Sequence, residues 1–145
     1  MVNVSNVEKG SLHADDLLVE WCDTYVYLGS SFTADGSVSS TLRAHTTAKI
    51  PHNLKFVSFI NKNNDIPFFM KRRVLDAALM SALLYGCESW LAAELKPIMS
   101  LYNLCFKELL GVRRSACNKM CYIESGYPPL QKIVKNKQHK FFHKI

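Results

Sequence analysis

Cationic side chains occur in short runs in this chain. Lys71, Arg72 and Arg73 follow one another, and Arg113 and Arg114 form a second group. Such side chains bind phosphate well, because arginine donates hydrogen bonds in a fork that matches phosphate oxygens. Runs of charge are also common on the solvated faces of packed helices. The first chemistry to consider is therefore phosphate binding, with a solvated charged rim as the alternative.

The adjacent carboxylates Asp15 and Asp16 suggest a second chemistry. Polymerases hold two magnesium ions with paired carboxylates in a tight turn between strands. That chemistry also needs a carboxylate from an earlier strand and a nucleotide pocket, yet only 14 residues precede Asp15. We therefore reject this pair as a catalytic site and expect no catalytic residue in the chain.

Two pairs of potential metal ligands occur near the C-terminus. Cys117 and Cys121 are four residues apart, as are His139 and His143. Two thiolates and two imidazoles at these spacings could complete a tetrahedral zinc site. The same spacing arises readily in a basic amphipathic tail. We favour buried cysteines and surface histidines, with no bound cofactor, and keep zinc as the weaker alternative.

The three consecutive cations lie in a predicted helix that begins near Pro67 and ends at Gly86. Proline suits a first helical turn, Asp65 is close enough to cap it, and glycine adopts the left-handed conformation that ends many helices. One face is apolar at helical spacing, and its members are Leu75, Ala78, Leu79, Ala82 and Leu83. Cations near the start of a helix oppose its dipole, which favours an anionic partner there.

Two strands and two further helices are predicted around this one. The strands are 17–21 and 24–30, with Cys22 and Asp23 forming a bulge or a turn between them. One helix should run from Val38 to Ile50, with Leu42 facing inward, and should break at Pro51. Another spans 93–110 and stops at Gly111; its buried face comprises Ile98, Tyr102, Cys105, Phe106 and Leu109.

The tail and the charge distribution complete this outline. Pro128 and Pro129 mark a break, after which apolar residues alternate with lysines in a predicted basic helix. Residues 1–36 carry a net charge of −5 and residues 37–145 a net charge of +11. Such an asymmetry is typical of a surface that meets a polyanion. The fold class is therefore α+β and predominantly α, with nucleic acid favoured over a membrane surface as the partner.

Several short motifs occur in an order that resembles one known family. The order is that of the region after the palm in reverse transcriptases of non-LTR, LINE-type retrotransposons. The similarity extends from about residue 18 to the end of the chain. Its main motifs are Tyr27-Leu28-Gly29-Ser30, then Leu83-Leu84-Tyr85-Gly86 with Glu88 and Trp90, then Leu109-Leu110-Gly111-Val112, and finally Gly126-Tyr127-Pro128-Pro129-Leu130.

The resemblance implies an acidic, primer-grip-like hairpin segment at 1–36, a thumb-like helical bundle at 37–112 and a basic extension at 113–145. The intact parent would be an RNA-directed DNA polymerase that uses magnesium, whereas this chain would lack the palm and be no enzyme. Its partners would be a template–primer backbone and the palm and fingers of a longer polymerase. Lys71, Arg72, Arg73, Arg113, Arg114 and Tyr27 would contact nucleic acid.

Departures from the family pattern favour an alternative. Ala44 and Thr47 stand where the family has larger or apolar core residues, and Pro51 stands where it usually has an aromatic one. A proline inside a helix costs about 3 kcal/mol. The alternative is a decayed or repurposed structural fragment with no specific ligand.

The cysteine count and the distribution of apolar residues indicate the cellular compartment of the protein. Five cysteines, an odd number, favour reduced thiols over a disulfide framework. No apolar run approaches the roughly 20 residues that cross a bilayer, and the start of the chain does not read as a signal peptide. We therefore expect an intracellular protein, in the nucleus or the cytoplasm.

Overall fold

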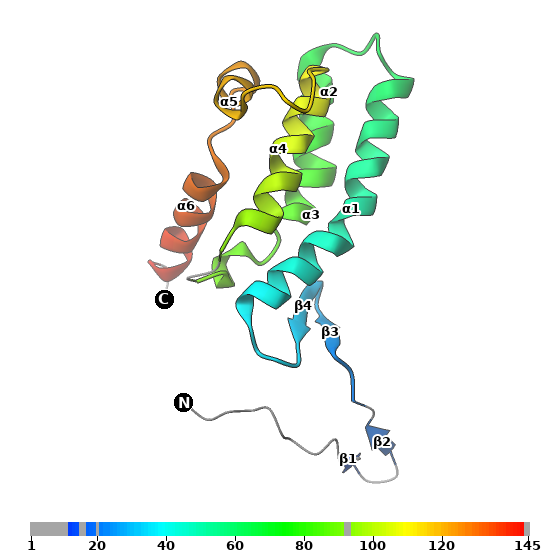
Figure 1. Ribbon diagram of the computed structural model, residues 1–145, viewed down its shortest axis with the longest axis vertical. Helices are drawn as coiled ribbons and strands as arrows, with labels where there is room; N and C mark the ends of the chain where they lie inside the picture. Colours follow the sequence, from blue (N-terminus) through cyan, green and yellow to red (C-terminus); the bar gives the residue numbers. More distant parts are fainter. Residues whose placement is uncertain (1–11, 15–16, 20, 92–93, 144–145) are drawn as a thin grey trace.

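The structure is a computed structural model, and it describes residues 12–14, 17–19, 21–91 and 94–143. It is an α+β fold dominated by helices, as the sequence predicts: two small hairpins lead into a helical bundle (Figure 1). Asp15 and Asp16 lie outside the described residues. Among the described helices, none has the length and apolar character needed to cross a membrane.

The strands form two separate antiparallel hairpins. β1 (Leu12–Ala14) pairs with β2 (Leu17–Val19), and β3 (Thr24–Tyr27) pairs with β4 (Ser30–Thr33). The predicted single strand over 24–30 is therefore wrong, because the chain reverses at residues 28 and 29. Leu28 and Gly29 both have positive φ, 48° and 82°. Positive φ at both positions matches the right-handed twist of the flanking strands in a two-residue turn.

The first helix, α1 (Val38–Lys62), passes through Pro51 without ending. The predicted break near Ile50 is wrong, and Figure 1 shows the helix bending instead. Tertiary packing explains this, because the helix buries side chains on both sides of the proline, Leu42 before it and Phe56 after it. Pro51 itself is exposed. At the start of α1, the Ser40 amide donates to Ser37 Oγ at 3.4 Å.

The cation-bearing helix is a composite of three segments. α2 (Phe68–Val74) continues into a π-helical stretch, η1 (Leu75–Met80), and then into α3 (Ser81–Leu83). Gly86 follows with φ of 71°, as predicted, and leads into a 3₁₀ turn, η2 (Cys87–Ser89). The predicted cap by Asp65 is wrong, since no side chain caps α2. Hydrophobic periodicity did not reveal the π-helical stretch.

Three more helices complete the bundle. α4 (Lys96–Leu110) ends at Gly111 with φ of 65°, and all five residues of its predicted inward face are buried. α5 (Asn118–Ser125) was not predicted, because it is short and weakly amphipathic. α6 (Leu130–Phe142) follows Pro129 and is the expected C-terminal helix.

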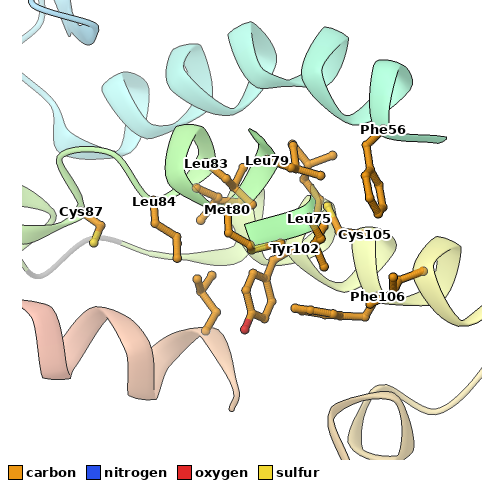
Figure 2. Packing of buried hydrophobic residues seen from close by; sticks show 14 of the residues in the cluster. Phe56, Leu75, Leu79, Met80, Leu83, Leu84, Cys87, Tyr102, Cys105 and Phe106 are labelled. Carbon is orange, nitrogen blue, oxygen red and sulfur yellow. The ribbon is translucent and has the colours of Figure 1, made fainter. Parts of the chain in front are cut away.

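One hydrophobic cluster joins these helices (Figure 2). Tyr102 and Phe106 of α4 lie at its centre with no exposed surface and stack edge to face, their ring centroids 4.6 Å apart. The Tyr102 hydroxyl donates to the Pro128 carbonyl at 2.7 Å, which fastens the segment before α6. Leu130 and Val134 of α6 belong to the same cluster, so α6 shares its core with the helices before it.

Candidate nucleic-acid interface

The consecutive cations of α2 point in different directions. Successive residues of a helix are about 100° apart around its axis, so three neighbours cannot share one face. Lys71 Nζ donates to the Asn64 carbonyl at 3.0 Å, which closes the loop before α2. Arg72 lies over the Tyr127 ring, with its Cζ 4.7 Å from the centroid. Arg73 is exposed and has no side-chain partner among the described residues.

The second arginine group lies in the loop between α4 and α5. Arg113 and Arg114 are both exposed. Arg114 Nη2 is 3.9 Å from Glu108 Oε1, and 81% of its side chain is accessible, so this ion pair is weak. Lys107 Nζ donates to the Arg114 carbonyl at 2.6 Å and ties the loop back to α4.

Figure 1 shows α2 and the α4–α5 loop at the same end of the bundle. The fold therefore brings together two cation groups that are 40 residues apart in the sequence. We call this end of the bundle, which carries Lys71, Arg72, Arg73, Arg113 and Arg114, the cationic end. Tyr27, on β3, lies towards the opposite end of the bundle. It is 58% exposed but is not part of the cationic end.

The cationic end is only slightly neutralised by acidic residues. Within the described part of the chain, the ion pairs are Lys96–Glu94 and Arg114–Glu108. Lys119, exposed in the first turn of α5, adds a further cation close in sequence to the arginine loop. Sequence reasoning missed it because α5 was not predicted. The arrangement suits contacts to several phosphates, because Arg73, Arg113 and Arg114 are exposed and only Arg114 has an ion pair, a weak one, among the described residues.

The two motifs that carry most of the resemblance meet in space. Gly29 of the β3–β4 turn lies against Tyr85: a Cβ placed on this glycine would be 3.4 Å from the tyrosine ring. A Cβ on Gly86 would be 3.1 Å from Ser30 Oγ. Both glycines have positive φ, so each is needed for its backbone conformation and for the closeness of this contact. The hairpin is thereby fitted to the turn after α3.

Comparisons of the chain with protein-family models, with curated proteins and with solved structures give no match.

A cavity of about 530 Å³ lies at the junction of the two motifs. Its walls come from β4, α1, the segment 85–91 and the end of α6. Its lining includes five aromatic side chains and Leu91, and His45, Glu88 and three serines are among the polar side chains. His45 is 3% exposed; its Nε2 donates to the Leu83 carbonyl at 3.0 Å and its ring meets Trp90 edge to face.

The four residues considered for zinc do not form one site. Cys117 is exposed and Cys121 is buried, whereas His139 and His143 contact each other on α6. In the part of the chain that the structure describes, no three His, Cys, Asp or Glu side chains come together as a metal site. Cys105 is a core residue, as predicted, and Cys87 is also in the core. Burial raises the pKa of Cys87 to about 11 and that of Cys105 to about 12, so both stay protonated at neutral pH.

Proposed function

We propose that this chain is the thumb-like, post-palm portion of a reverse transcriptase of the non-LTR retrotransposon type. In this role it binds the sugar–phosphate backbone of a template–primer duplex without regard to sequence. The observation that carries the proposal is the cationic end, where Arg73 and Arg113 are exposed on separate elements at one end of the bundle. The contact between Gly29 and Tyr85 supports it further, because it joins the two motifs most typical of the family.

Binding at the cationic end would be electrostatic. Each neutralised phosphate releases condensed counterions, so the logarithm of affinity falls with the logarithm of salt by about 0.9 per contact. Arg73 and Arg113 are the best residues to remove, because neither side chain has a partner among the described residues. Arg72 is a poorer choice, since its stacking on Tyr127 makes it part of the fold.

The test is a duplex titration over a range of salt concentrations. Arg73→Gln with Arg113→Gln should lower the magnitude of the salt slope by about 2, from two lost phosphate contacts. Lys135→Gln with Lys140→Gln is the matched control, because both lysines are exposed on α6, which runs away from the cationic end. An unchanged slope in the arginine variant would refute the interface and favour the charged-rim alternative.

A second measurement separates duplex recognition from general charge attraction. An acidic polypeptide of similar length offers negative charge without the spacing of a phosphate backbone. Tighter binding to the duplex at equal salt is expected. Equal affinity for both polymers would favour a repurposed fragment with no specific ligand. No primer extension is expected from the chain alone, because polymerisation needs a palm and fingers, which partners would supply.

A further inference from the structure

Two imidazole rings face each other on the last turns of α6. His139 and His143 are four residues apart, which places them on one face of the helix. Their Nε2 atoms are 2.8 Å apart and their ring centroids 4.0 Å apart. Both side chains are exposed, so an ion could reach the two nitrogens without opening the core.

We propose that His139 and His143 form a two-point chelate for a divalent transition-metal ion of the nickel or copper type. Metal–imidazole bonds are about 2.0–2.1 Å long. Two such bonds at a right angle, as in tetragonal or octahedral coordination, place the nitrogens about 2.9 Å apart, whereas tetrahedral coordination needs about 3.3 Å. The observed 2.8 Å matches the right-angled geometry.

A metal ion would replace the hydrogen bond between the rings and would lie to one side of the line that joins the two nitrogens. One imidazole donates its Nε2 proton to the other, so the proton occupies the position between two lone-pair sites. When the metal binds, the donating ring carries its proton on Nδ1 instead and both Nε2 atoms become ligands. Water fills the remaining coordination positions, because both rings are open to solvent. Affinity then follows the usual order, with copper and nickel above other divalent ions of the first transition row.

The chelate has a structural consequence. Phe141 and Phe142 lie between the two histidines in the sequence and line the cavity beside Tyr85 and Trp90. A metal that joins His139 to His143 closes the end of α6 and so holds the turn that carries both phenyl rings. Because the ion binds the folded helix and not the unfolded chain, it also stabilises the fold by mass action.

The test uses Ni²⁺ alone, titrated calorimetrically into the untagged full chain at about pH 7.5. Cys22→Ser and Cys117→Ser form the background, because these two exposed thiols would compete for the ion. One Ni²⁺ should bind per chain. His139→Gln should weaken binding about 100-fold, because the second bond of a chelate is intramolecular.

The pattern among variants decides the proposal. His143→Gln should show the same loss as His139→Gln, since either change leaves a single imidazole as the ligand. The double variant should lose binding at this site altogether. His52→Gln, an exposed histidine on α1, should leave the affinity within about twofold, as expected for an independent site. Ni²⁺ should raise the melting temperature of the background protein and not of His139→Gln. Retention of the original affinity in either single variant, an equal loss in His52→Gln, or tighter binding of Zn²⁺ than Ni²⁺ would overturn the proposed site.

Discussion

The guanidinium group of Arg72 lies over the ring of Tyr127, and the hydroxyl of that tyrosine donates to the carboxylate of Asp76. Tyr127 comes just after α5, whereas Arg72 and Asp76 belong to α2 and η1. One aromatic ring therefore fastens the C-terminal helices to the cation-bearing helix. Arg72 therefore takes part in holding the fold together, whereas its neighbour Arg73 is exposed and can contact a ligand.

Replacing Tyr127 by phenylalanine should loosen this connection. The ring and its contact with Arg72 remain, but the hydrogen bond to Asp76 is lost, at a cost of roughly 1 kcal/mol in the free energy of unfolding. Urea unfolding measures the change. Arg73→Lys is the control and should stay within about 0.5 kcal/mol of the original protein. A Tyr127→Phe variant as stable as the original would show that the hydroxyl contributes nothing to the fold.

Gly86→Ala should destabilise the protein more than Gly111→Ala. Both glycines have positive φ, so alanine at either position should lower the free energy of unfolding by about 1–2 kcal/mol because of the left-handed conformation. Of these two glycines, Gly86 is the one where the added Cβ would meet another atom, Ser30 Oγ at 3.1 Å. The space around Gly111 is open. Denaturant midpoints of the two variants give the difference. Adding Ser30→Ala should recover part of the loss in Gly86→Ala and none in Gly111→Ala; equal behaviour would argue against a close contact with the hairpin.

Pro51→Ala should stabilise the protein. The alanine restores an amide that can donate to the carbonyl of Thr47, and it removes the clash of the proline ring inside α1. The gain should be about 2 kcal/mol, because the flexible unfolded chain offsets part of the roughly 3 kcal/mol helix penalty. Thermal unfolding followed by circular dichroism is a suitable measurement. A loss of stability would mean that the bend of α1 at the proline is required for packing.

His45 should make stability depend on pH. Burial lowers its pKa from the ordinary value of 6.5; the hydrogen bond to Leu83 opposes this shift and the charge of Lys49 adds to it. The unfolded chain therefore binds a proton that the folded chain does not, so the free energy of unfolding is highest above pH 6.5 and falls at lower pH, by at most about 1.4 kcal/mol per unit.

His45→Gln should remove this part of the pH dependence, because glutamine can keep a donor near Leu83 without titrating. Urea unfolding at pH values above and below 6.5 provides the comparison. His52→Gln, in which the replaced histidine is exposed, should retain the original dependence. If His45→Gln and the original protein lose stability equally on acidification, another group must be responsible.

Local sequence patterns predicted the structure correctly where a pattern lies within a single helix or at its end. The apolar face of α4 was readable because its residues recur at helical spacing and are all buried, and Gly86 and Gly111 were readable as helix ends because left-handed backbone strongly favours glycine. The same rules failed at Pro51, where buried residues on both sides of the proline hold α1 together. They also failed at Leu28, a non-glycine residue in the turn of β3 and β4.

The sequence by itself determined which residues carry charge, which faces are apolar and where the helices can end, because these properties depend on neighbours within a few residues. Only the tertiary structure decided that Arg72 stacks on Tyr127 while Arg73 stays exposed, and that the α4–α5 loop lies at the same end as α2. These relationships join segments tens of residues apart. They depend on how the helices pack around Tyr102 and Phe106, which no local pattern specifies.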